Sequence, residues 1–79
     1  MKAKVFIRLK SGVLDPQGKA VEEALKTLGY DEVKGVRVGK FIELEVDGDS
    51  KEAVEIRVNE MSEKLLANTV VEDFKVEVE

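Results

Sequence analysis

Apolar and polar residues alternate strictly over residues 2–10. Every second residue is apolar, which would place these side chains on one side of an extended chain: Ala3, Val5, Ile7 and Leu9. A period of two is typical of a β-strand with one buried face. Residues 40–46 and 70–78 repeat the alternation, and residues 33–38 are rich in β-branched side chains. The sequence therefore predicts four strands.

Residues 16–28 have the spacing of an amphipathic helix. Asp15 can accept hydrogen bonds from free backbone N–H groups, and Pro16 suits the first helical position, where its missing donor costs nothing. Gly29 can end the helix in a left-handed conformation. The apolar stripe would consist of Ala20, Val21, Ala24, Leu25 and Leu28.

A second helix is predicted over residues 51–67. Residues 47–50 supply a turn, with Asp49 as the helix N-cap and Glu52 three residues later, as in a capping box. Asn68 is a plausible terminator. The buried face would carry apolar residues at steps of three and four: Val54, Val58, Met61 and Leu65.

The predicted order β-α-β-β-α-β corresponds to an α+β, ferredoxin-like domain spanning residues 1–79. Right-handed crossovers would put both helices on one face of a four-stranded antiparallel sheet, and Gly39 would form a tight hairpin between the middle strands. Phe6 and Phe41 would then project from the uncovered face. Because a lone domain would expose these rings, we expect this face or an edge strand to pack against another copy.

Composition excludes most kinds of chemistry. The 79 residues contain no Cys and no His, which removes thiolate nucleophiles, the usual zinc sites and imidazole bases. The net charge of −4, with both signs mixed along the chain, argues against nucleic acid and membrane as partners. The chain starts with a strand pattern and has no apolar signal core, so we expect a cytoplasmic protein. Abundant Glu and Lys suggest a thermophilic source.

Several specific sites fit the sequence poorly. Residues 47–50 resemble a metal loop but lack the further oxygen ligands that calcium needs, and residues 10–13 contain only one of the clustered glycines of a phosphate loop. Glu43 and Glu45 beside Phe41 argue against RNA binding. A catalytic pair among the 17 acidic residues is less plausible than solvated surface charge. A small-molecule-sensing module that binds ligand at a subunit interface remains the main alternative, and a small stand-alone enzyme ranks below it.

Three segments carry more detail than a generic scaffold requires. Residues 13–18 read Val-Leu-Asp-Pro-Gln-Gly, and their Gly18 costs roughly 1 kcal/mol in a helix relative to Ala, which suggests a close approach. Residues 36–40 place two cations around Gly39, and residues 65–74 read Leu-Leu-Ala-Asn-Thr-Val-Val-Glu-Asp-Phe. Together they resemble the PurS family, the small subunit of formylglycinamide ribonucleotide amidotransferase, over almost the whole chain.

This resemblance implies an assembly role in purine biosynthesis. PurS-like proteins form dimers or larger assemblies that join a PurL-type synthetase to a PurQ-type glutaminase. The complex converts formylglycinamide ribonucleotide, glutamine and ATP into formylglycinamidine ribonucleotide, glutamate, ADP and phosphate. The glutaminase would hold the thiolate that releases ammonia, and the synthetase would bind magnesium and ATP. This subunit would then have no cofactor and no catalytic residue, and would help to keep ammonia from escaping.

The three segments supply the candidate contact positions: Asp15, Pro16, Gln17, Gly18, Arg37, Gly39, Lys40, Asn68, Thr69 and Glu72. Several have a simple structural explanation. Asp15 and Pro16 can merely start a helix, Gly39 can merely permit a positive φ, and Asn68 can merely end a helix. Arg37 and Lys40 are the stronger functional candidates, because a tight hairpin does not require cations.

Overall fold

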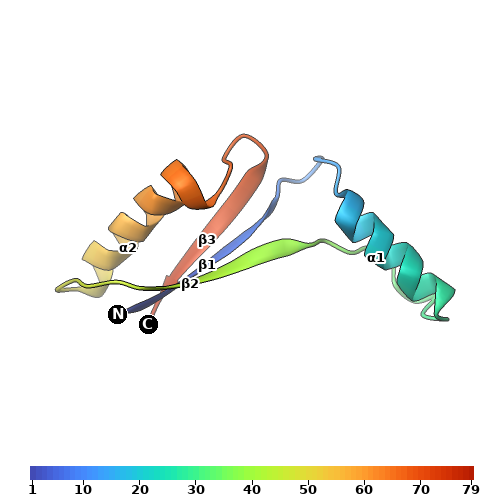
Figure 1. The fold of residues 1–79 in the computed structure, drawn as a ribbon, viewed down its shortest axis with the longest axis horizontal. Helices are drawn as coiled ribbons and strands as arrows, with labels where there is room; N and C mark the ends of the chain where they lie inside the picture. The colour runs from blue at the N-terminus through green and yellow to red at the C-terminus, as the bar shows by residue number, and fades with distance from the viewer.

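A computed structural model describes all 79 residues and contains one three-stranded antiparallel sheet. Its strands are β1 (Lys2–Leu9), β2 (Gly39–Glu45) and β3 (Glu72–Val78), in the order β2-β1-β3 (Figure 1). Val5 lies between Ile42 and Val76 in the paired register, so the alternating apolar residues share one face. The three alternating segments of the sequence are thus confirmed as strands.

The helices are α1 (Pro16–Thr27) and α2 (Lys51–Met61), and α2 continues into a π-helical turn, Ser62–Leu66. The N-cap of α2 is Ser50, whose hydroxyl accepts from the Ala53 N–H at 3.1 Å, so the prediction of Asp49 was wrong by one residue. No helix is both long and apolar enough to span a bilayer.

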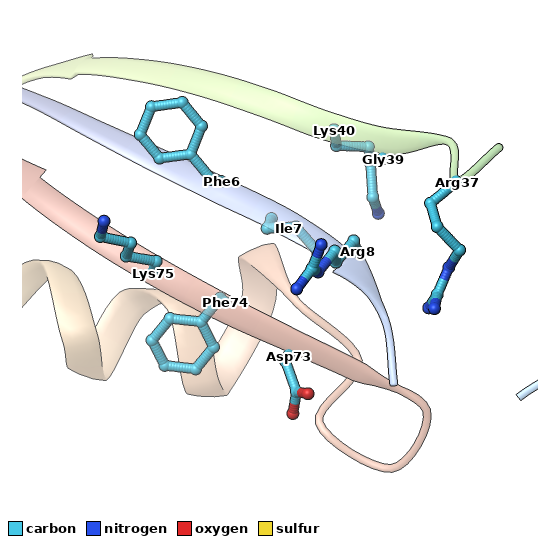
Figure 2. Close-up of a pocket in the computed structure, with 9 residues that line it drawn as sticks. All are labelled: Phe6, Ile7, Arg8, Arg37, Gly39, Lys40, Asp73, Phe74 and Lys75. Atoms are coloured by element: carbon cyan, nitrogen blue, oxygen red, sulfur yellow. The ribbon is translucent and has the colours of Figure 1, made fainter. Parts of the chain in front are cut away.

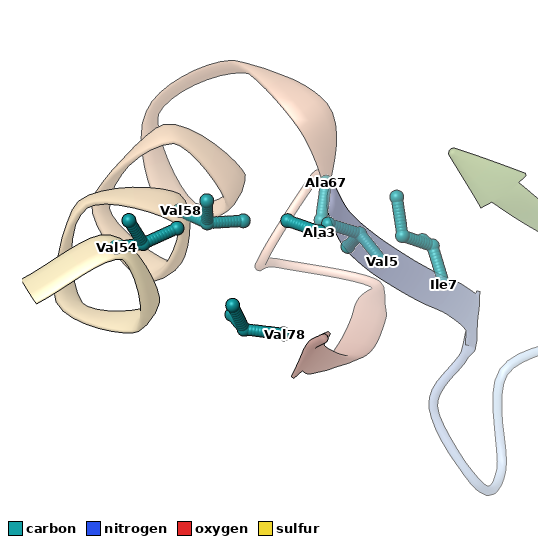
Figure 3. Close-up of a cluster of buried hydrophobic side chains, with 7 residues drawn as sticks. All are labelled: Ala3, Val5, Ile7, Val54, Val58, Ala67 and Val78. Carbon is teal, nitrogen blue, oxygen red and sulfur yellow. The ribbon is translucent and has the colours of Figure 1, made fainter. Parts of the chain in front are cut away.

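Helix α2 covers one face of the sheet and forms the core with it (Figure 3). The buried apolar side chains are Ala3, Val5, Ile7, Val54, Val58, Ala67 and Val78. The predicted burial of Met61 and Leu65 was wrong, since Leu65 is 82% exposed. A π-helix has more residues per turn than an α-helix, so residues four apart stay on the same side of it. Ser62 and Leu66 therefore face the core instead. The Ser62 hydroxyl is satisfied by donating to the Val58 carbonyl at 2.8 Å.

The predicted strand over residues 33–38 does not form. The Val38 N–H donates to the Asp15 carboxylate instead of to a neighbouring strand. Figure 1 shows this segment returning beside α1 before it enters β2. The four-stranded sheet and the tight hairpin at Gly39 were therefore wrong, because a side-chain acceptor takes the place of a strand partner.

Helix α1 does not cover the sheet, contrary to the prediction of two helices on one face. No side chain of α1 belongs to the core, and the helix projects beyond the end of the sheet (Figure 1). We call α1 together with residues 28–38 the arm. The radius of gyration is 15.9 Å, whereas a compact chain of this length would have about 12 Å.

The projecting arm leaves apolar surface in contact with solvent. Val21 is 42% exposed and Leu28 is 73% exposed, although both lie on the apolar stripe of α1. The accessible surface of 5816 Å² exceeds the roughly 4,800 Å² expected for a compact monomer of this mass. The surplus of about 1,000 Å² is comparable to what a specific protein interface buries.

The face of the sheet opposite α2 carries Phe6 and Phe41 on neighbouring strands. They are 41% and 51% exposed, as the alternation predicted. Their ring centroids lie 5.1 Å apart, so they form one aromatic pair rather than two isolated rings. We call this the open face.

Gly18 explains how α1 fits against its returning segment. It is the only buried residue of the helix, and a Cβ at this position would overlap the Val36 carbonyl oxygen and crowd the Asp15 carboxylate. The close approach inferred from this unfavourable helical glycine is confirmed, and the approaching group belongs to the same chain.

Gly18→Ala should destabilise the fold by about 1–3 kcal/mol, because a methyl group has no space against backbone. Helix propensity alone would predict a gain of about 1 kcal/mol for the same change. Gly35→Ala is the matched control, since no atom lies within 4 Å of the place its methyl group would take and the φ of Gly35 is not positive. Urea unfolding would contradict the role of Gly18 if both variants behaved alike.

Candidate functional site

Most candidate residues meet where the arm joins the sheet. We call this region the junction. A cavity of about 220 Å³ lies there. Its lining includes five of the candidates: Asp15, Gln17, Gly39, Lys40 and Glu72. Residues from both halves of the chain thus share one small site.

Asp15 links the start of α1 to the entry of β2. Its Oδ1 accepts from the Gly18 N–H at 2.9 Å, which confirms the predicted N-cap, and its Oδ2 accepts from the Val38 N–H at 3.0 Å. These two backbone hydrogen bonds lower the pKa of Asp15, and the nearby Arg37 guanidinium lowers it further. The carboxylate is therefore held in its charged form, which is the better acceptor.

Arg37 closes the junction from the other side. Its Nε lies 3.8 Å from Asp15 Oδ2, and its Nη2 donates to the Leu9 carbonyl and, at 3.3 Å, to the Lys10 carbonyl. These carbonyls lie at the end of β1, and the Lys10 carbonyl also accepts from the Val13 N–H at 3.1 Å. Arg37 therefore has a structural role, which could not be foreseen from the sequence while a hairpin was expected at this point.

Glu72 connects Lys40 to the loop before β3. One carboxylate oxygen accepts from the Asn68 N–H at 2.7 Å, and the other lies 3.5 Å from Lys40 Nζ. Asn68 turns the chain, because its side-chain oxygen accepts from the Val70 N–H at 3.2 Å. Asn68 lies beyond the π-helical turn, in the position that the terminator prediction gave it.

Gly39 allows close packing rather than a reversed turn. Its φ is not positive, and a Cβ at this position would overlap the Ile7 carbonyl oxygen. The remaining candidates have no side-chain hydrogen bond: Pro16, Gln17 and Thr69 are all exposed. Their roles as contact positions stay predictions.

A larger cavity of about 510 Å³ lies on the open face beside the junction (Figure 2). Arg37, Gly39 and Lys40 belong to its lining, together with residues that were not among the candidates: Ile7, Arg8, Asp73, Phe74 and Lys75. The alternation of β1 already placed Arg8 on the same face as Phe6, so this signal was present in the sequence. Nowhere do three or more carboxylates converge as a candidate metal site.

Asp15→Asn should lower the melting temperature at pH 7, because an amide can offer only one oxygen to the two N–H groups. The folded pKa of Asp15 is lowered, so its stabilisation is present above the unfolded value of about 3.9 and disappears as the pH falls through the folded pKa. The difference from the parent chain should therefore shrink in acid.

Thermal unfolding from pH 7 down to about pH 2 measures this difference. Asp31→Asn serves as the control, since Asp31 is exposed and forms no hydrogen bond or ion pair. A melting difference for Asp15→Asn that stayed constant over the whole range would contradict the role of the charge.

Comparison with known proteins places the chain in a family. The family model for PurS, described as phosphoribosylformylglycinamidine (FGAM) synthase, matches residues 2–79. The PurS subunit of Bacillus subtilis is 51% identical over 78 residues, which cover 99% of this chain and 92% of that protein. The PurS subunit of Methanocaldococcus jannaschii is 45% identical, and the alignment covers 99% of this chain and 94% of that protein.

Solved structures agree over the arm as well as the sheet. A crystal form of B. subtilis PurS aligns with a TM-score of 0.87 at 52% identity, covering 99% of this chain and 96% of that one. A chain in the structure of PurLQS from Thermotoga maritima aligns with a TM-score of 0.89 at 37% identity, covering 96% and 93%. The chain belongs to the PurS family and is a subunit of phosphoribosylformylglycinamidine synthase, in purine biosynthesis.

Proposed function

We propose that this chain is the non-catalytic assembly subunit of its synthase, bridging a PurL-type synthetase and a PurQ-type glutaminase. The observation that carries the proposal is the similarity, over 96% of the chain, to a chain of the T. maritima PurLQS structure. A bridging subunit needs exposed recognition surface more than a deep active site. The arm and the open face provide such surface.

Catalysis then belongs to the partners. The glutaminase supplies ammonia from glutamine, and the synthetase binds magnesium and ATP and converts formylglycinamide ribonucleotide to formylglycinamidine ribonucleotide. This subunit carries no cofactor and supports ammonia transfer by holding the two larger subunits together. A chain without Cys or His is suited to this role. We place the complex in the cytoplasm, where we expect the three subunits to be made together.

Self-association completes the proposal. The stripe of α1 exposes Val21 and Leu28, and its own sheet does not cover it. The surplus surface of about 1,000 Å² would be buried if the arm packed against a second copy. Burial of apolar area at about 25 cal/mol per Å² would add stability that a core of seven residues cannot supply alone.

Leu28→Glu should therefore dissociate the oligomer, because it places a charge within the apolar stripe. Light scattering coupled to gel filtration should show a shift toward the 8.8 kDa monomer. Lys19→Glu puts the same side chain on the polar side of α1 and should leave the mass unchanged. A parent chain that is monomeric at all concentrations would disprove self-association through the arm.

Assembly with the partners is tested by adding this chain to the synthetase and glutaminase of the same organism. Glutamine-dependent synthesis and co-elution of all three proteins should appear only when it is present. No binding and no effect on activity would overturn the proposed function.

Lys40→Ala should raise the concentration of this chain needed for half-maximal activity about tenfold, the loss expected when a residue that contributes strongly to an interface is truncated. Lys40 is preferred to Arg37 because its side chain is 58% exposed and makes only one ion pair. Lys51→Ala, an exposed cation at the start of α2, is the control and should behave like the parent chain.

A further inference from the structure

The larger cavity on the open face is unusually basic for this protein. Its charged lining consists of Arg8, Arg37, Lys40, Lys75 and Asp73. Four cations and one carboxylate give a local charge of +3, whereas the whole chain has a net charge of −4. Asp15, Glu72 and Glu77 pair with Arg37, Lys40 and Lys75 from outside this lining, so Arg8 is the cation of the cavity that has no ion-pair partner. Cations grouped in this way create a local field that attracts anions.

The sheet register explains why there is space beside Arg8. Arg8 pairs with Gly39 on β2 and with Asp73 on β3. Gly39 has no side chain, so the position next to Arg8 on the β2 side stays open, and Arg37 lies just before it. Figure 2 shows Arg8 and Arg37 on either side of this position.

Arg8 and Lys75 are the cations of the cavity that are available to a ligand. Arg8 forms no ion pair and is exposed, and its nearest acidic cross-strand neighbour, Asp73, is not bonded to it. Lys75 pairs with Glu77 at 3.5 Å, but its side chain is 74% exposed. Exposed ion pairs contribute little free energy, so a stronger anion can replace this partner.

The apolar side of the cavity is aromatic. Phe6 occupies the next position on the open face from Arg8, and its ring lies against Phe41. The volume of about 510 Å³ is within the range of small-molecule sites. Guanidinium groups suit phosphate because their planar donors can bind two of its oxygens together.

We propose that this cavity binds a phosphate monoester with an aromatic or other flat group. The phosphate lies between Arg8 and Lys75, with Arg37 at the edge, and the flat group stacks on Phe6. A small ligand fits better than an acidic protein segment, because the two available cations lie beside a single exposed ring: Phe6 is directly opposite Lys75 and two residues from Arg8 on β1. The site belongs to this chain alone and does not depend on the proposed assembly role.

Titration calorimetry of the full chain with adenosine 5′-monophosphate tests the proposal, with adenosine and inorganic phosphate as separate probes. Saturable binding is expected at about 1 mM nucleotide or below, weaker binding of phosphate, and none of adenosine. Arg8→Gln and Lys75→Gln should each weaken nucleotide binding about tenfold, because each removes a charge-assisted hydrogen bond. Binding should also weaken as salt is added.

Arg57→Gln is the matched control. Arg57 is a 69% exposed cation on α2 and pairs with Glu60 there. This variant should bind nucleotide like the parent chain, and circular dichroism should show that all three variants are folded. The proposal is overturned by absence of nucleotide binding, by equal binding of adenosine, or by equal loss in Arg57→Gln. Binding of polyglutamate without binding of nucleotide would assign the cavity to an acidic protein segment instead.

Discussion

The carboxylate of Asp15 is the interaction on which the shape of the chain depends. It accepts one N–H from the first turn of α1 and another from Val38, at the entry to β2. An ordinary helix cap uses only the first of these. The second bond ties together the two ends of the arm, so that the arm leaves the sheet and returns to it at one point. Arg37 fixes the same point to the end of β1 through the carbonyls of Leu9 and Lys10.

This arrangement makes the monomer less stable but leaves more of its apolar surface exposed. Had α1 folded onto the sheet, its stripe would have joined the core and the chain would have been compact. Instead α2 is the helix that packs against the sheet, and the core consists of seven buried residues. A chain of this size is marginal even when fully compact, because it buries only a modest fraction of its surface. The exposed stripe of α1 is therefore best understood as a surface whose burial completes the stability of the fold.

Local patterns predicted most elements but not how they are arranged. The alternation around Val5 and the cap at Asp15 each depend on neighbouring residues, and both were found from the sequence. The π-helical turn shifted burial from Leu65 to Leu66, which a regular helical period cannot anticipate. Residues 33–38 have the composition of a strand, but the Val38 N–H donates to the carboxylate of Asp15, which is distant in sequence. That contact brings the candidate residues together at the junction. The candidates themselves could be selected from the sequence only through the family resemblance.

The junction and the basic cavity are linked by the residues they share. Gly39 and Lys40 line both cavities, and Arg37 lines the larger one while it pairs with Asp15 in the junction. Lys40 is held toward Glu72, which also orders the loop before β3. An anion held between Arg8 and Lys75, with Arg37 at its edge, would draw Arg37 away from Asp15. The bonds that orient the arm would then weaken, so occupation of the open face and the orientation of the arm are expected to affect each other in both directions.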